Sequence, residues 1–332
     1  MKKIANSVSI SLLNFPESIL DGILERLSPI ELIKMSEVCI CLRNKCRSDH
    51  FWEIHMKQKW GRVIGHVALK EWQWHVTSIT AEEGSVLNQQ INNIQNGSLG
   101  SFSGAWPMLC LGSYFEECTH LKSLLLSNNF KMALYLSLES GKFWFPAQLF
   151  RGLYVHEALL SYDSKTDTFQ ARTRSGNWRI VGNKIHWDKL RPSLVETSSC
   201  VRHVSDCYQD LKLGDHIEIQ WRGNTQTPYG EIKYDHNDSE SSTHLNFYWW
   251  YAVIGHLDSC NENENYCFCQ NSETLVVEFK QYPRGSSMRK TMLRRHNNGE
   301  QAENSIGNYG GIRKLRDEEE IEKWKELLDH RL

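Results

Sequence analysis

Four side chains that can bind a metal ion lie within a stretch of 14 residues. They are spaced as His-x3-Cys-x6-Cys-x-Cys, and they are His256, Cys260, Cys267 and Cys269. Structural zinc sites use four nitrogen and sulfur ligands in a tetrahedron, so these residue types suit zinc. The spacing matches no zinc motif that we can name, and four reduced side chains at a hairpin loop are the simpler interpretation. We therefore assign no metal or other cofactor from the sequence and keep zinc as the alternative.

A run of basic side chains follows the metal-binding candidates. It holds six cations with no acidic residue between them: Lys280, Arg284, Arg289, Lys290, Arg294 and Arg295. Such a run can contact nucleic acid, an acidic peptide or a phosphate group, because guanidinium groups bind phosphate oxygens in pairs. A solvated loop is the simpler interpretation. The net charge of the whole chain is −2, which gives no general attraction to nucleic acid or to a membrane.

The sequence offers no recognisable catalytic residues. It has no GxSxG, P-loop, GxGxxG before a helix or HExxH pattern, and its 14 histidines show no partner pattern. No apolar run approaches the roughly 20 residues of a membrane helix, and the N-terminal residues are too polar for a signal peptide. The ten cysteines are expected to be reduced, as in cytosolic proteins. These observations predict a non-enzymatic protein of the cytoplasm or nucleus.

The elements that position these side chains are expected to be mostly strands. The expected strands are 153–161, 168–174, 178–187, 216–222, 247–257 and 274–281. In the fourth of them, Ile217, Ile219 and Trp221 alternate with polar residues, which predicts a half-buried strand with its polar face in water. Asp317 is expected to cap a last helix, with Trp324 on its inward face.

Part of this β-rich half is similar to the small barrels of the Agenet and Tudor type. The similarity is in the order of a Gly214-Asp215 turn, a strand that starts with aromatic residues and a Val-x-Phe strand. In such barrels an aromatic cage can hold a methylated lysine by cation–π attraction. The residues expected to bind a target are Trp221, Trp249, Trp250, Tyr251, Arg289 and Arg295. Packing is the alternative role for the tryptophans, because adjacent residues of a strand point to opposite faces.

Residues 13–52 are expected to form a series of short helices. Pro16 suits the first turn of a helix, and apolar residues then recur at helical spacing from Leu20 to Leu27. Ser28-Pro29-Ile30-Glu31 is a capping box that starts the next helix, and Asp49 is expected to cap a fourth. Three or four short helices over about 45 residues bury little surface. Their exposed apolar face is therefore expected to need a partner.

This segment resembles an F-box, the helical module that attaches a protein to a Skp-family adaptor of a cullin ubiquitin ligase. Many F-boxes carry a tryptophan shortly after the Val-Cys pair, where this chain has Leu42-Arg43. The resemblance rests on an ordered set of apolar positions and implies that they bind the adaptor. These positions are Leu13, Phe15, Pro16, Leu20, Ile23, Leu24, Leu27, Leu32, Val38, Cys39, Leu42 and Trp52.

The whole chain also resembles a group of plant F-box proteins, from about residue 10 to 330. The shared segments are His156 to Asp163, Trp249-Trp250-Tyr251, and Tyr309 to Leu315. The resemblance implies a non-catalytic, substrate-recognition subunit of an SCF-type (Skp–cullin–F-box) ubiquitin ligase. The implied partners are a Skp-family adaptor, through it a cullin, and a protein target that the sequence does not identify.

We therefore expect an α+β multidomain protein with short N-terminal helices and a mainly β domain that ends in a helix. The expected divisions are an F-box at 10–60, a helical segment and flexible linker at 61–110, and a β-rich substrate-binding domain at 111–332. The alternative function is a Tudor- or Agenet-like reader of peptides or chromatin, in which the N-terminal helices only pack. The sequence names neither the target, nor its modification state, nor the pathway.

Overall fold

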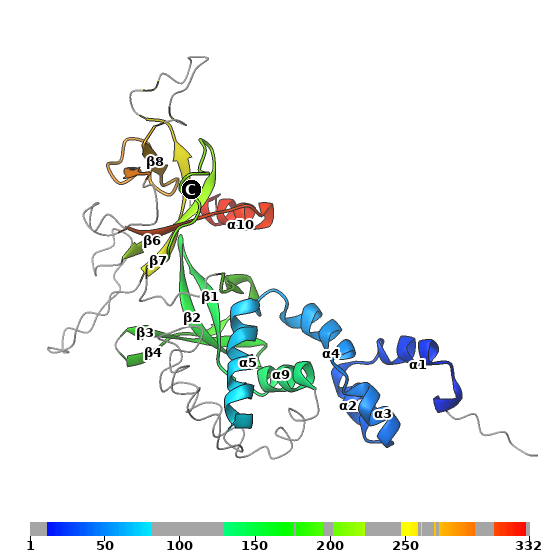
Figure 1. Ribbon diagram of the computed structural model, residues 1–332. Coiled ribbons are helices and arrows are strands. Elements are labelled where there is room, and N and C mark those ends of the chain that lie inside the picture. The colour runs from blue at the N-terminus through cyan, green and yellow to red at the C-terminus, as the bar shows by residue number, and fades with distance from the viewer. Residues whose placement is uncertain are drawn as a thin grey trace, which may run out of the picture.

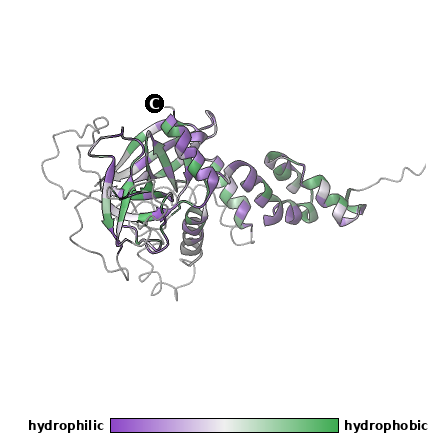
Figure 2. Cartoon of the chain, turned by 90° about the horizontal axis from the view of Figure 1, so that it is seen from above, coloured by the Kyte–Doolittle hydropathy of each residue, from purple (hydrophilic) through white to green (hydrophobic). Residues whose placement is uncertain are grey.

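The computed structural model describes residues 12–81, 129–141, 143–175, 177–194, 202–222, 247–257, 260, 269, 272–295 and 309–329. Within these residues an arm of short helices projects from a sheet-rich body, and a C-terminal helix packs on that body (Figures 1 and 2). This arrangement confirms the expected α+β fold of short helices, a mainly β domain and a final helix. Of the expected helical segment and linker at 61–110, residues 82–110 lie outside the described residues.

The arm consists of four short helices after a helical turn, η1 (Leu12–Asn14). They are α1 (Glu17–Leu24), α2 (Pro29–Ser36), α3 (Ile40–Cys46) and α4 (Asp49–His55). A π-helical turn, η2 (Met56–Trp60), continues α4, and α5 (His66–Ala81) follows. The predicted capping box of α2 is confirmed: the Ser28 backbone N–H donates to Glu31 Oε2 at 2.8 Å, and the Glu31 N–H donates to Ser28 Oγ at 3.4 Å.

Helix α9 (Phe130–Glu139) is capped by the arm rather than by its own sequence. Its N-cap residue, Asn129, makes no side-chain capping bond, whereas Asp49 Oδ1 accepts a hydrogen bond from the Lys131 N–H at 2.8 Å. The sequence predicted that Asp49 would cap the fourth helix; it instead lies in the first turn of α4 and caps α9. The arm and the body are therefore joined by a polar contact as well as by packing.

Ten strands form one antiparallel sheet in the described part of the chain. They are β1 (Phe145–Arg151), β2 (Tyr154–Asp163), β3 (Thr168–Ser175), β4 (Asn177–Ile185), β5 (Leu190–Pro192), β6 (His216–Arg222), β7 (Phe247–Gly255), β8 (Thr274–Glu278), β9 (Lys290–Arg294) and β10 (Tyr309–Lys314). The central order is β10-β6-β7-β2-β1-β5, with β3 and β4 branching from β2, and β8 and β9 from β7. A turn, η4 (Trp187–Lys189), precedes β5, and α10 (Glu318–Asp329) follows β10.

The sheet has two halves that meet at a short pairing between β2 and β7. Only Tyr154 with Trp250 and Val155 with Trp249 are paired there. The half from β1 to β5 packs against α5 and α9, and the half from β6 to β10 has a core of its own. Strands β6, β7 and β8 are consecutive antiparallel neighbours, the order expected for an Agenet- or Tudor-type barrel. Membership of that barrel class stays a prediction.

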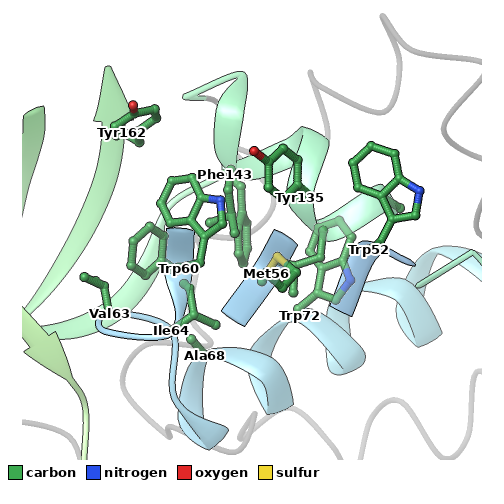
Figure 3. Close-up of a cluster of buried hydrophobic side chains, with 14 of the residues drawn as sticks. Trp52, Met56, Trp60, Val63, Ile64, Ala68, Trp72, Tyr135, Phe143 and Tyr162 are labelled. Atoms are coloured by element: carbon green, nitrogen blue, oxygen red, sulfur yellow. The ribbon is translucent and has the colours of Figure 1, made fainter. Parts of the chain in front are cut away.

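The arm and the first half of the sheet share one aromatic core. Trp52, Trp60 and Trp72 are fully buried between α4, η2, α5, α9 and the sheet (Figure 3). The ring of Trp60 meets that of Tyr162 edge-on at 5.1 Å, and Trp72 meets Phe143 in the same way at 5.0 Å. Such aromatic pairs add to the stabilisation from buried area. The arm is therefore anchored in the body by its last turns.

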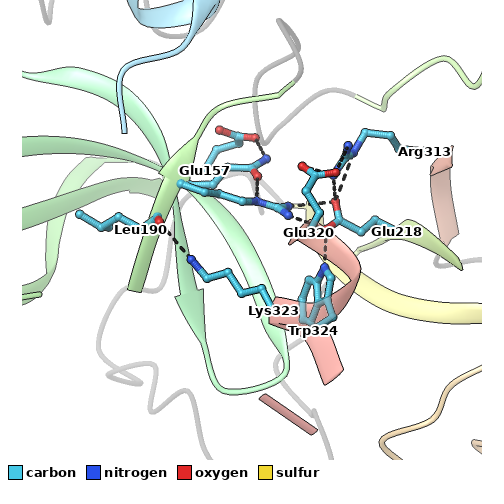
Figure 4. Close-up of polar contacts among 9 residues, drawn as sticks. Glu157, Leu190, Glu218, Arg313, Glu320, Lys323 and Trp324 are labelled. Carbon is cyan, nitrogen blue, oxygen red and sulfur yellow. Dashed lines mark hydrogen bonds and ion pairs between the residues drawn. The ribbon is translucent and has the colours of Figure 1, made fainter. Parts of the chain in front are cut away.

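A chain of buried polar side chains runs beneath α10 through both halves of the sheet (Figure 4). Its centre is Glu218 on β6, which is fully buried. Arg191 Nη1 and Nη2 donate to the two Glu218 carboxylate oxygens at 2.7 and 2.9 Å. Arg313 Nη2 donates to Glu218 at 2.9 Å, and Trp324 Nε1 donates to it at 2.6 Å. Arg191 Nε also donates to Gln148 Oε1 at 2.6 Å, which extends the chain to β1.

The prediction that β6 has a polar face in water was wrong. Glu218 and Gln220 on that face are both buried. Helix α10 covers Glu218 through Trp324. The backbone of His203 covers Gln220, and its N–H donates to Gln220 Oε1 at 2.7 Å. Burial alone would raise the pKa of Glu218. The positive charges of Arg191 and Arg313 outweigh burial and lower this pKa to about 2. Glu218 is therefore an ionised carboxylate in the interior.

Glu157 lies at the other end of the polar chain in a different charge state. It is buried, and it accepts hydrogen bonds from Gln148 and, at 2.7 Å, from Ser193 Oγ. Burial raises the pKa of Glu157 from 4.5 to about 7, although both hydrogen bonds and Arg191 act to lower it. The folded chain therefore holds a proton on Glu157 at pH values where the unfolded chain has lost it.

Glu157→Gln is expected to flatten the pH dependence of stability between about pH 4.5 and 7. The folded pKa lies above the unfolded one, so the stabilisation is complete below the unfolded pKa and is lost as pH rises through the folded pKa. The native chain should lose on the order of 1–3 kcal/mol of unfolding free energy that the variant retains. Urea unfolding at about pH 5 and 8 measures this difference, and the exposed Glu37→Gln is the control. Equal pH profiles for Glu157→Gln and the native chain would contradict the buried, protonated Glu157.

Candidate functional site

Exposed apolar side chains are concentrated on the N-terminal arm. Eleven large apolar side chains are exposed among the described residues, and seven of them lie between positions 13 and 40. These seven form what we call the arm face: Leu13, Phe15, Ile19, Ile23, Ile30, Val38 and Ile40. Val38 and Ile40 are the most open of all, at 68% and 70% exposure. A concentration of this kind is typical of a surface that binds another protein.

Helix α1 carries two parallel apolar rows, one for the interior and one for solvent. Leu20 and Leu24 are four residues apart and are buried in the arm. Ile19 and Ile23 have the same spacing one position earlier, so they form a neighbouring row, and both are exposed. Packing between the short helices buries only the row of Leu20 and Leu24. The second row remains available to a partner.

The structure divides the predicted adaptor-binding residues into surface and core. Leu13, Phe15, Pro16, Ile23 and Val38 are exposed, and Leu27 and Cys39 are intermediate. Five others are buried: Leu20, Leu24, Leu32 and Leu42 within the arm, and Trp52 where the arm meets the body. In the isolated chain these side chains support the exposed ones, and their role as direct adaptor contacts stays a prediction. Sequence reasoning missed Ile19, Ile30 and Ile40, and of these only Ile19 had a signal, its helical spacing to Ile23.

Charged contacts on the arm add to this packing. Lys45 Nζ on α3 lies 2.7 Å from Asp21 Oδ1 and 2.8 Å from Glu17 Oε1 on α1. Asp21 and then Glu17 raise the pKa of Lys45 by stabilising its charged form. Ion pairs exposed to solvent contribute at most about 1 kcal/mol each. The geometry of the arm face therefore depends mainly on the buried leucines beneath it.

The aromatic residues predicted to bind a target are mostly core residues. Trp249, Trp250 and Tyr251 are each 5% exposed or less. Trp250 packs against Trp221 at 4.8 Å on one face of β7, while Tyr251 stacks on Trp324 of α10 at 5.7 Å on the other. The prediction of an open aromatic cage was wrong for these residues, because both faces of β7 are covered. The alternative role in packing agrees with their burial, and Trp221 is itself half-buried.

The two arginines predicted to select a target bind their own chain. Arg289 Nε donates to Glu278 Oε1 at 2.7 Å. Arg295 donates at 3.1, 2.7 and 2.7 Å to the backbone carbonyls of Ser272, Tyr208 and Leu211. These guanidinium groups tie loops to the sheet, so their predicted role as free selectors is also corrected. Target binding by this set of residues stays a prediction.

Three of the four metal-binding candidates come together at the end of β7. Nδ1 or Nε2 of His256 and the sulfur atoms of Cys260 and Cys269 all lie within 4.8 Å of one another. The fourth candidate, Cys267, lies outside the described residues.

Six cysteines of the described part are free thiols. No helix among the described residues is both long and apolar enough to cross a membrane.

Both the arm and the chain as a whole are similar to known proteins. A family model for the F-box domain matches residues 12–54. The F-box protein At2g26850 of Arabidopsis thaliana is 40% identical over an alignment 332 residues long. The alignment covers 96% of this chain and 82% of the relative. The F-box protein At2g41170 of the same plant is 39% identical over 327 residues, covering 96% and 83%. No solved structure gives a significant match to this chain.

The division of α1 into two rows leads to a prediction about stability. Leu24→Ala should lower the free energy of unfolding by about 2–5 kcal/mol, because it leaves a cavity at a fully buried position. Ile23→Ala should change it by less than about 1 kcal/mol, because Ile23 faces solvent. Denaturant unfolding of both variants makes the comparison. Equal effects at the two positions would show that the rows are not divided between core and surface.

Proposed function

Because the chain belongs to the F-box protein family, we propose that it is the substrate-recognition subunit of an SCF-type ubiquitin ligase. In this role it links a protein target to the ligase and catalyses nothing itself. The observation that carries the proposal is the arm face, where seven large apolar side chains are exposed on a small helical segment. A Skp-family adaptor covers this face and connects the chain to a cullin.

The joint between arm and body supports such a linking role. The last turns of the arm bury Trp52 and Trp60 in the core that α9 and the sheet complete (Figure 3). Asp49 adds its bond to the N-terminus of α9. A target held by the body therefore stays at a defined distance from the adaptor. A fixed geometry of this kind keeps the effective concentration of the target near the ligase high.

We assign target recognition to the sheet-rich body together with α10. No catalytic residue is needed for this function, and the polar side chains around Glu218 are buried away from any substrate. The target is a protein. It binds a surface of the body other than the Trp249-Trp250-Tyr251 run, because that run is buried.

The double variant Val38→Asp, Ile40→Asp should weaken binding to a Skp-family adaptor by at least about 30-fold. Anchoring side chains of an interface commonly contribute about 2 kcal/mol or more, and the variant would also bury two charges there. Titration calorimetry with the purified adaptor measures the affinity. Ile180→Asp is a matched control, because Ile180 is an apolar residue with 52% exposure on β4, outside the arm.

Circular dichroism should show that all three proteins remain folded. Unchanged affinity in the double variant would contradict docking through the arm face. An equal loss in Ile180→Asp would show that the charge acts non-specifically.

The same double variant offers a test of the ligase role in cells. Proteins that bind both the native chain and the variant, but are ubiquitinated only with the native chain, are the expected targets. Profiling of ubiquitinated peptides after expression of each form identifies them. If the two forms give the same ubiquitination profile, the chain is not a substrate receptor, even where the adaptor binds.

A further inference from the structure

The segment that connects β7 to β8 brings an imidazole and two thiols into one place. His256 directly follows β7, which ends at Gly255, and Cys260 and Cys269 lie further along the connection. The nitrogen and sulfur atoms of the three side chains lie within 4.8 Å of one another. Imidazole nitrogen with thiolate sulfur is the ligand set of structural zinc sites. The residue types and their placement thus point to the same metal.

The distances between these atoms agree with ligands around one zinc ion. Zinc lies about 2.3 Å from sulfur and about 2.0–2.1 Å from nitrogen, so a tetrahedral angle places the two ligand atoms about 3.6 Å apart. His256 Nδ1 is 3.4 Å from Cys260 Sγ and 3.8 Å from Cys269 Sγ. The two separations lie on either side of the tetrahedral value. Both nitrogen–sulfur separations therefore suit ligands of one metal ion, and the two sulfur atoms lie within 4.8 Å of one another.

The surroundings hold the ligands in position. Cys269 is buried, and its Sγ accepts a hydrogen bond from the Leu257 N–H at 3.3 Å. Hydrogen bonds of this kind orient metal ligands. Arg295 donates to the carbonyl of Ser272 and fastens that part of the connection to the body.

The metal would add a link to the described part of the connection. Strands β7 and β8 pair from Val253 with Glu278 to Gly255 with Val276. Beyond that pairing, the described residues of the connection are joined by local turns, such as the Cys260 N–H to Leu257 O bond at 2.9 Å. A metal ion bound by His256, Cys260 and Cys269 would join residues up to 13 positions apart in the connection and lower its entropy. Binding energy at such a site is folding energy.

We propose that His256, Cys260 and Cys269 bind a structural zinc ion that fastens the β7–β8 connection to the end of β7. A fourth ligand, a water molecule or another donor, completes the tetrahedron. A disulfide between the two cysteines is the competing use of the same thiols. Zinc is favoured because His256 Nδ1 lies at metal-binding distance from both sulfur atoms. A disulfide would use the two thiols alone. The site is separate from the arm face and adds to the ligase role.

Elemental analysis of the purified full chain tests the site. The native protein should carry about one equivalent of zinc, since structural sites hold one ion. Replacement of zinc by cobalt should produce the near-ultraviolet absorption of thiolate bound to cobalt. Cys260→Ser and Cys269→Ser should each lower the metal affinity by at least about tenfold. His256→Cys keeps a ligand and should retain the metal, and Cys41→Ser, which changes an exposed cysteine of the arm, should have no effect.

The cobalt spectrum of the native chain and the His256→Cys variant keep the test valid if a serine variant fails to fold. The proposal is overturned if the native protein binds neither zinc nor cobalt with its thiols reduced. It is also overturned if both serine variants keep the metal. A Cys260–Cys269 disulfide, found after rapid alkylation of the thiols in intact cells, would assign these residues to the competing function.

Discussion

The buried carboxylate of Glu218 is the contact on which the body of the protein depends. It lies on β6, and its donors come from β5, β10 and α10 (Figure 4). A buried charge is costly unless every lone pair has a partner, and the loss of one partner commonly costs about 3–5 kcal/mol. The strands and the last helix therefore close around Glu218 together. The same contact links the two halves of the sheet, because Arg191 also binds Gln148 on β1.

The two carboxyl groups of this polar chain show how position decides charge. Glu218 is ionised because two guanidinium groups outweigh its burial. Glu157 is held by neutral donors, so burial decides, and its pKa rises. The negative charge of Glu218 adds to that rise. One chain of hydrogen bonds thus contains a permanent charge at its centre and a titrating group at its end.

The segments shared with the plant proteins meet in the folded body. Each segment contributes one residue to the same region: Arg313 donates to Glu218, and Tyr251 stacks on Trp324 of α10. Glu157 joins the same polar chain through Gln148, which accepts from Arg191. In the segment from Tyr309 to Leu315, position 311 must be glycine for a steric reason. A Cβ on Gly311 would lie 2.1 Å from the carbonyl oxygen of His203. These segments therefore have a structural role, which explains why the aromatic run among them is buried rather than open to a target.

The sequence by itself determined the local elements. The box at Ser28, the spacing of α1 and six of the ten strands follow from backbone and side-chain preferences that act within a few residues. Strands β1, β5, β9 and β10 were not predicted. It also determined that Trp324 faces inward, because that residue lies on the apolar side of an amphipathic helix. The F-box assignment followed from the same local pattern of ordered apolar positions.

Only the tertiary structure decided what covers each face. It placed Leu20 in the core and Ile19 in solvent, buried the polar side of β6, and brought His256 beside Cys269. Periodicity shows that a face is apolar or polar, but burial depends on elements far away in the chain. The bond from Trp324 to Glu218 joins residues 106 positions apart, and no local preference encodes a contact over that distance.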